Sequence, residues 1–396
     1  MIGKMIKTGL ESTMNAFVEE MKTIFTDGGA ILLLIVAVTI YPVVYSIAYK
    51  NNVVRDIPVA VVDLDRSQLS RQMSRMLDAT KEVAVHTETG NMEEAQKLFW
   101  DGTARGIILI PSDFEKGLLK GEQSDISVYC DASYFLIYKE TLTGLIQSSG
   151  TLSAGVEIKR LIASGALPDA AMQQRDPMKL NIYQLYNPSG AYGSYVMPGL
   201  ILIVIQQTLL IGIGMIGGAR KERGDSVIAG DPARRRKTIF PIILGKAFAY
   251  FVIYVFNVLF TQIIIYKWFG FPDKGSIADT AILMVPYIFS IIFLGLSISL
   301  LLRRREHSIM LMVFLSPVVL FLSGMSWPEN AIPPLLYKIA HIFPSTTMVP
   351  AFLRLRTMGA SLSDIRPELI FLLVQMVVYA ALAVMSYRIY IRRRSN

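Results

Sequence analysis

The sequence has little of what most enzyme sites need. It contains one cysteine, Cys130, and three histidines, which lie far apart at residues 86, 307 and 341. A single cysteine excludes an intrachain disulfide, and this set suggests no cluster of metal ligands. Neither Gly-Lys pair, at residues 3–4 and 245–246, has the glycine spacing and following Ser or Thr of a phosphate-binding loop. We therefore expect no enzyme, and neither a metal nor a cofactor in this chain.

Charged residues are also scarce. They make up 18% of the 396 residues, against about 25% in soluble proteins, while 53% are hydrophobic. Six apolar runs are long enough to cross a membrane as helices, at 30–49, 193–218, 239–266, 280–302, 309–325 and 368–390. They predict a polytopic α-helical membrane protein with six transmembrane helices. The span centres lack charge, and we expect Lys246, near one end of the third run, to snorkel to the surface.

The basic side chains indicate the orientation. The net charge is +8, and Lys and Arg gather before the first run, in the loop at 219–238, after the fourth run and at the C-terminus. These are alternate connections, so the positive-inside rule places both termini in the cytoplasm and residues 50–192 outside. The basic surplus is a topology signal, and we expect no nucleic-acid partner.

Residues 1–29 show a helical period. Apolar side chains recur at three- and four-residue steps, at Leu10, Met14, Phe17, Val18, Met21, Ile24 and Phe25. The other face has Glu11, Asn15, Glu19, Glu20 and Lys22. This pattern predicts a cytoplasmic amphipathic helix on the inner membrane surface, in contact with lipids. A plain helical leader stays open as an alternative.

Residues 50–192 alternate strand-like and helix-like stretches. We predict strands at 57–63, 82–86, 106–110 and 126–130, and helices at 67–79, 92–100, 112–119 and 134–164, with a last strand at 179–186. This alternation predicts an inserted extracytoplasmic α/β domain with a partly parallel sheet.

Residues 193–396 contain the remaining five spans. The neutral polar residues Gln206, Gln207, Asn257 and Gln262 are candidates for a translocation path or for bridges between helices, and Gly214 with Gly218 favours close helix contact. Residues 326–366 are rich in proline, too apolar for a solvated loop and too interrupted for a span. We expect short re-entrant or interfacial helices there; an ordered surface loop is the alternative.

Several short motifs are specific in their order and spacing. In the insert they are Ile57-Pro58-Val59-Ala60-Val61-Val62-Asp63-Leu64-Asp65-Arg66-Ser67, then residues 106–114 and 128–133. Later come Lys221-Glu222-Arg223-Gly224, Ser323-Gly324, Trp327-Pro328, Pro333-Pro334 and Phe343-Pro344-Ser345. With these motifs the chain resembles the permease subunits of type 2 ABC exporters, in the branch with a large extracytoplasmic insert between spans one and two, often described as multidrug- or sodium-efflux permeases.

The resemblance implies specific roles. Residues 8–25 would be the interfacial connecting helix, and Glu222, Arg223 and Gly224 in the coupling loop 219–238 would contact a separate cytoplasmic ABC ATPase, which holds the ATP and Mg. Lipid-headgroup binding by this basic loop is the simpler alternative. The outer gate would include Trp327, Pro328, Pro333 and Pro344. Asp225 stands where the family commonly has Thr, which affects the detail of the coupling contacts.

The sequence therefore predicts a permease subunit in the bacterial inner membrane. It would export an amphiphilic small molecule, drug or lipid as a dimer with itself or a sibling, and a periplasmic adaptor and outer-membrane channel could complete the route. Two alternatives are a membrane-anchored extracytoplasmic receptor or assembly factor, and a secondary transporter. The second would be expected to bury an ionisable group.

Overall fold

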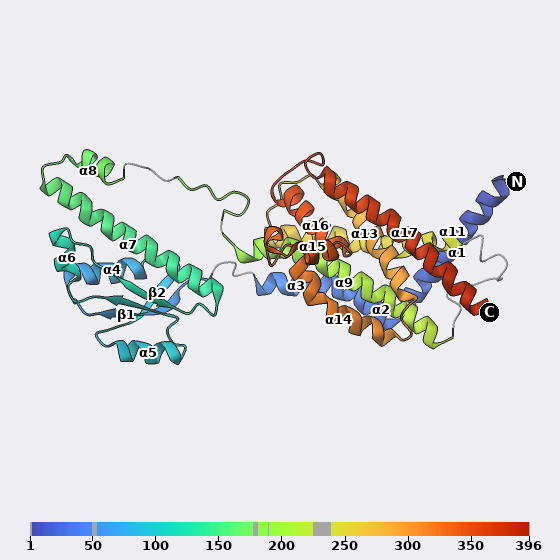
Figure 1. The fold of residues 1–396 in the computed structure, drawn as a ribbon, viewed down its shortest axis with the longest axis horizontal. Coiled ribbons are helices and arrows are strands. Elements are labelled where there is room, and N and C mark those ends of the chain that lie inside the picture. Colours follow the sequence, from blue (N-terminus) through green and yellow to red (C-terminus); the bar gives the residue numbers. More distant parts are fainter. Residues whose placement is uncertain (1, 50–53, 177–180, 189, 225–238, 396) are drawn as a thin grey trace. The chain divides into compact units, whose positions relative to one another are not determined.

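The computed structural model describes residues 2–49, 54–176, 181–188, 190–224 and 239–395 (Figure 1). The chain forms two compact units. The helical unit combines Met1–Asn52 with Gln184–Asn396, and the insert unit is Val53–Tyr183. The insert unit thus lies, in sequence, between two segments of the helical unit.

Within the described residues, six helical stretches are long and apolar enough to cross a membrane, which confirms the predicted number. The first joins α2 (Gly28–Ile31), the π-helical η1 (Leu32–Ala37) and α3 (Val38–Ala48), and is preceded by α1 (Ile2–Thr26). The third joins α11 (Ile239–Leu259), the π-helical η2 (Phe260–Ile265) and α12 (Tyr266–Phe269). The others are α9 (Tyr192–Glu222), α13 (Ile277–Ser299), α14 (Arg305–Leu322) and α17 (Arg366–Ser395).

Helix α9 lies at the centre of the helical unit. It contacts α3, α13, α14 and the short helix α16 (Pro344–Phe352), and 83% of its most apolar stretch is buried, against 17% for α14. A β-carbon at Gly214 would lie 2.2 Å from the Ser308 hydroxyl, and one at Gly218 would lie 2.5 Å from the Arg304 backbone. The two glycines therefore make the close helix contact that their spacing favours.

Successive spans run in opposite directions. At one end, Glu222 at the end of α9 contacts Arg305 at the start of α14, and Lys221 contacts Tyr390 near the end of α17. We call this the basic end of the helical unit; α9, α13 and α17 end there, and α11 and α14 begin there. At the opposite end, the Tyr195 hydroxyl near the start of α9 donates to the backbone oxygen of Met325, beyond α14.

Short helices occupy the opposite end between residues 326 and 366. They are the 3-10 turn η3 (Glu329–Ala331), α15 (Pro334–Ala340), α16 and the π-helical η4 (Leu353–Thr357). Helix α16 is almost wholly buried against α9, α13 and α17, whereas most of α15 is exposed. The two helices thus differ in how firmly the bundle holds them.

The insert unit is a four-stranded mixed sheet covered by helices. Its strands are β1 (Ile57–Asp63), β2 (Val83–Thr89), β3 (Gly106–Ile110) and β4 (Ser127–Cys130), in the order β2-β1-β3-β4. β1 is parallel to β2 and β3, and β4 is antiparallel to β3. The predicted partly parallel sheet is therefore confirmed.

Helices lie on both faces of this sheet (Figure 1). They are α4 (Gln68–Asp78), α5 (Met92–Trp100), α6 (Phe114–Lys120) and α7 (Phe135–Ala163), and α8 (Pro168–Arg175) packs on α7. Ala95 of α5 packs with Ala60 and Val62 on one face, and Met73 of α4 packs with Val59 and Val61 on the other. The strand β1, buried on both faces, accordingly reads as a continuous apolar run.

The strand predicted at 179–186 is wrong for residues 181–186, which form no strand. Residues 179 and 180 lie outside the described part of the chain. Ile182, Tyr183 and Leu185 are all exposed. The run has the side chains of a strand, but no sheet edge pairs with its backbone, and a strand needs that partner.

Candidate functional site

The face of α1 that packs on the protein is not the face that the sequence indicates. Leu10, Met14, Val18 and Phe25 are exposed, whereas Ala16, Glu20 and Ile24 are buried. Ala16, Glu20 and Ile24 are spaced four residues apart, so they lie on one face of the helix. The expectation that Glu20 lies on the solvated face is therefore wrong. The exposed apolar stripe suits contact with lipid, and α1 turns a carboxylate toward the bundle.

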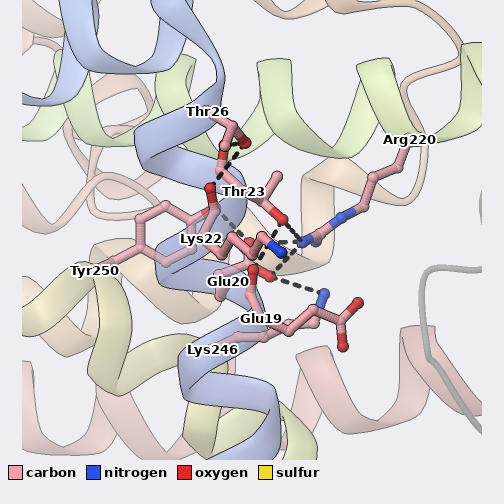
Figure 2. A network of polar contacts seen from close by, with 8 residues as sticks. All are labelled: Glu19, Glu20, Lys22, Thr23, Thr26, Arg220, Lys246 and Tyr250. Atoms are coloured by element: carbon pink, nitrogen blue, oxygen red, sulfur yellow. Dashed lines mark hydrogen bonds and ion pairs between the residues drawn. The ribbon is translucent and has the colours of Figure 1, made fainter.

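Glu20 lies at the centre of a polar cluster, shown in Figure 2. The Arg220 guanidinium donates from Nη1 to Oε1 at 3.2 Å and from Nη2 to Oε2 at 2.7 Å. The Lys246 ammonium lies 3.1 Å from Oε2, and the Tyr250 hydroxyl donates to Oε1 at 2.7 Å. Arg220 Nη2 also donates to the Thr23 hydroxyl at 3.2 Å. We call Glu20, Thr23, Arg220, Lys246 and Tyr250 the Glu20 cluster.

The Glu20 cluster joins three elements. Glu20 and Thr23 belong to α1, Arg220 lies at the end of α9, and Lys246 and Tyr250 are one turn apart on α11. The bidentate ion pair between Arg220 and Glu20 is of the strong kind and fixes the orientation of the guanidinium relative to the carboxylate. The cluster therefore holds α1 to the basic ends of two spans at once.

Charge in the Glu20 cluster is unbalanced. Glu20 is 1% exposed, Arg220 7% and Lys246 4%, so one carboxylate faces two buried cations. Burial raises the pKa of Glu20, but the charges of Arg220 and Lys246 and the hydrogen bonds from Arg220 and Tyr250 outweigh it and lower the pKa to about 2. Glu20 stays ionised. The expectation that Lys246 snorkels to the surface is wrong, because α1 covers it and supplies its counter-charge.

A glycine allows α1 to approach α11 at this place. A β-carbon at Gly245 would lie 2.2 Å from the carbonyl oxygen of Thr13 and 2.9 Å from the β-carbon of Ala16. No other residue type fits so close to a backbone without moving it. Gly245 thus brings Lys246, the next residue, within reach of Glu20.

The last residues of α9 also contact the other spans. The Lys221 ammonium donates to the carbonyl oxygen of Leu300, after α13, and lies 5.4 Å from the centre of the Tyr390 ring in α17. Glu222 Oε1 accepts from the backbone nitrogen of Arg305 at 3.0 Å, at the start of α14. Three consecutive residues, 220 to 222, therefore join α9 to α1, α13, α14 and α17, and Glu20 extends this connection to α11.

Arg305 extends these contacts to the start of the first span. Its Nη2 donates to Asp27 Oδ1 at 2.9 Å and to Oδ2 at 3.2 Å. Asp27 Oδ1 in turn accepts from the backbone nitrogens of Gly29 and Ala30 at 3.0 and 3.1 Å, which caps α2. The basic end is thus one connected set of polar contacts from α1 to α17.

The predicted coupling residues lie at the edge of this set. Glu222 is the last residue of α9, Arg223 follows it, and Gly224 has a φ of +71°, which favours glycine. All three are exposed. The rest of the predicted coupling loop, with Asp225, falls on residues 225–238, outside the described part of the chain.

The predicted path residues divide into two kinds. Gln206 and Ser345 exchange hydrogen bonds of 3.0 and 2.9 Å, which tie α9 to α16, and Asn257 donates to the Leu34 carbonyl oxygen in η1 at 2.8 Å. These two bridge helices. Gln207 and Gln262 are buried, and their side-chain amides have no hydrogen-bond partner among the described residues. Only this second pair keeps amide groups available for another molecule.

The predicted gate residues do not share one environment. Trp327 is exposed and donates from Nε1 to the carbonyl oxygen of Ala331 at 3.3 Å. Pro328 and Pro333 are exposed and precede η3 and α15, whereas Pro344 is buried at the start of α16. Prolines suit the first positions of helices, where no amide donor is needed.

Sequence reasoning missed a second buried cation at the opposite end. Arg356 in η4 is 2% exposed; its Nε and Nη2 lie 2.6 and 2.7 Å from the Asp273 carboxylate. Its Nη2 also donates to the Gln262 carbonyl oxygen at 3.0 Å, and its guanidinium lies 5.1 Å from the Tyr266 ring centre. Arg356 therefore holds the short helices to the third span.

Comparisons with known proteins bear on this architecture. The model of a family described as ABC-2 family transporter protein matches residues 29–385. The inner membrane transport permease YhhJ of Escherichia coli (strain K12) is 21% identical over 385 residues, which cover 96% of this chain and 97% of that protein. The probable multidrug ABC transporter permease YbhR of the same organism is 27% identical over 169 residues, covering 42% and 44%. No solved structure matches the chain.

Proposed function

Because the chain belongs to the ABC-2 family of transporter proteins, with the role of an ABC transporter permease in the inner membrane, we propose that it forms the membrane path of an exporter driven by a separate ATPase. Its substrate would be an amphiphilic small molecule, drug or lipid. The basic end would face the cytoplasm, with both termini, and the insert unit would lie outside. A second copy or a sibling subunit would complete the path.

The Glu20 cluster is the observation that carries this proposal. An ATPase that drives transport from the cytoplasm needs a rigid connection to several spans. The ion pairs of Glu20 and the contacts of residues 220 to 222 provide one at the basic end, where the expected coupling residues Glu222 and Arg223 lie. A push on α1 or on the end of α9 would move both together.

Transport would follow from two arrangements of the spans. The ATPase, holding ATP and Mg, would close on nucleotide and shift α1 and the end of α9. Through Gln206 and Ser345, α9 is tied to α16 near the opposite end. Movement of α9 would therefore reach the short helices around Trp327 and Pro344, where we place the exit. A periplasmic adaptor and an outer-membrane channel would act beyond it.

The test is co-purification with a co-expressed candidate ABC ATPase subunit of the same organism, followed by measurement of its ATP hydrolysis. We expect the wild-type chain to retain the ATPase, and Glu222→Ala or Arg223→Ala to weaken retention. Lys338→Ala, an exposed cation in α15 at the opposite end, is the control and should have no effect. Unchanged retention and turnover in the first two variants would contradict their coupling role.

The buried Lys246 supports a second candidate, a secondary transporter. Buried ionisable groups in spans commonly belong to ion or proton pathways, and Lys246 is buried beside Glu20. This candidate predicts uptake or export by reconstituted vesicles under an ion gradient without ATP. Transport that needs both the ATPase and ATP would exclude it.

A further inference from the structure

An apolar groove lies on the helical unit, and no residue of the Glu20 cluster is among those that line it. It has a volume of about 800 Å³ and lies between α11, α13 and α17, which contact one another. Eleven residues line it, ten of them apolar, and the eleventh is Arg388. An apolar hollow with one cation has the composition of a site for a molecule with a tail and an anionic head.

The groove follows the axis of α17. Its lining residues on that helix run from Met376 to Arg388 at alternating steps of one and three residues, so they form one continuous stripe. The twelve steps from Met376 to Arg388 span about 18 Å at 1.5 Å per residue. The hydrocarbon core of a bilayer is about 30 Å thick, so the groove has the length of one leaflet.

Arg388 lies at the basic end of the groove. It is exposed, it stands near the end of α17, and Phe240 at the start of α11 lines the same end. In the described part of the chain Arg388 forms no ion pair, unlike Arg220, Arg305 and Arg354. Its charge is therefore available at the depth where lipid headgroups lie.

Stacked aromatic rings make one wall of the groove. Phe289 lies 5.9 Å from Phe293 and 4.6 Å from Phe251, both in stacked geometry, and 5.8 Å from Phe248 edge to face. Phe289 and Phe293 line the groove, and rings held by such packing lose little side-chain freedom when a chain binds against them. The groove is thus a preformed surface on the helices themselves.

We propose that this groove binds one anionic phospholipid from the leaflet at the basic end. An acyl chain would lie against Phe289 and Phe293, and the phosphate would bind the Arg388 guanidinium. The site lies on spans three, four and six, separate from the Glu20 cluster, and does not depend on which molecule the protein exports. It would make the stability of the helical unit sensitive to the anionic lipid content of the membrane.

Native mass spectrometry of the purified chain tests the site. The probes are dioleoyl phosphatidylglycerol and dioleoyl phosphatidylethanolamine, which share their tails and differ in charge. We expect the wild type to bind one phosphatidylglycerol about tenfold more tightly than phosphatidylethanolamine, as one charge-assisted contact provides. Arg388→Gln should remove that preference, because it weakens phosphatidylglycerol binding more than the binding of the zwitterionic phosphatidylethanolamine.

Two further variants separate the headgroup from the groove. Ala381→Trp fills the groove from an exposed position of α17 and should lower the binding of both lipids. Arg303→Gln removes an exposed cation at the same end without lining the groove and should change neither. An unaltered preference in Arg388→Gln, undiminished lipid binding in Ala381→Trp, or a dimer that Ala381→Trp dissociates would overturn the proposal; the last result would assign the groove to a second copy.

Discussion

Glu20 and Arg220 stand 200 residues apart in sequence and meet in a two-pronged ion pair, the shorter contact being 2.7 Å. Glu20 comes from a helix before the first span, and Arg220 from the last turn of the central one. Their contact makes α1 part of the bundle rather than a separate surface element.

Glu20→Gln should destabilise the helical unit strongly. It leaves Arg220 and Lys246 buried together without a counter-charge, and removing one partner of a buried pair typically costs about 3–5 kcal/mol. Thermal unfolding of the detergent-solubilised protein measures the effect. Glu11→Gln, at an exposed position of the same helix, is the matched control and should change the free energy of unfolding by less than about 0.5 kcal/mol. Equal effects of the two variants would show that the buried ion pairs contribute nothing.

Lys246→Met should be tolerated far better than Glu20→Gln. It leaves Glu20 paired with Arg220, one charge against one, and removes the desolvation cost of a second cation. A buried pair is costly to break because one charge is left uncompensated, and no such charge remains here, so we expect a change within about 1 kcal/mol. The double variant with Glu20→Gln should be more stable than Glu20→Gln alone. A Lys246→Met variant as unstable as Glu20→Gln would contradict this charge balance.

Acid should weaken the Glu20 cluster. The pKa of Glu20 is lowered from an ordinary 4.5 to about 2, so its contribution is fully present above about pH 4.5 and is lost as the pH falls toward 2. That lowering corresponds to about 3 kcal/mol. Unfolding curves between pH 6 and pH 2 should therefore fall more steeply for the wild type than for Glu20→Gln. Parallel curves would mean that the pKa of Glu20 is not lowered.

Gly245→Ala should displace α1. The new β-carbon would meet the Thr13 carbonyl oxygen, and overpacking of this kind costs about 1–3 kcal/mol. Gly155→Ala, in α7 of the insert unit with no atom within 4 Å of the new carbon, should instead raise stability by about 0.5–1 kcal/mol through helix propensity. Thermal unfolding distinguishes the two. A stabilising Gly245→Ala would refute the close crossing of α1 and α11.

The sequence predicted the spans and the sheet because both follow from repeating patterns. An apolar run of about 20 residues forms a helix when it crosses a membrane. The apolar run of β1, which is short and bounded by turn residues, is typical of a buried strand. The strand prediction was wrong at 181–186 because a strand needs a pairing partner, which can be distant in sequence. These side chains are typical of a strand, but no neighbouring strand among the described residues lies beside them to pair with their backbone.

The Glu20 cluster could not be found by the same means. The hydrophobic pattern places Glu20 on the solvated face of α1. At a membrane, however, the apolar face of a helix can contact lipid while its polar face packs against protein. Two features of the sequence indicate this contact. Ala16, Glu20 and Ile24 lie on one face of a helix, and the small Gly245 before Lys246 allows a second helix to approach closely. No pattern in the sequence indicates the contacts of Arg356, because Asp273 and Tyr266 are more than 80 residues away and only the folded chain brings them together.

We propose that the Glu20 cluster transmits movement of the ATPase to the spans. The most direct measurement is hydrogen exchange of residues 326–366 in the complex with the ATPase, with and without ATP. We predict that ATP changes this exchange in the wild type. In the Glu20→Gln/Lys246→Met double variant, the change should disappear although the ATPase stays bound and hydrolyses ATP. An identical ATP-dependent change in both proteins would contradict the claim.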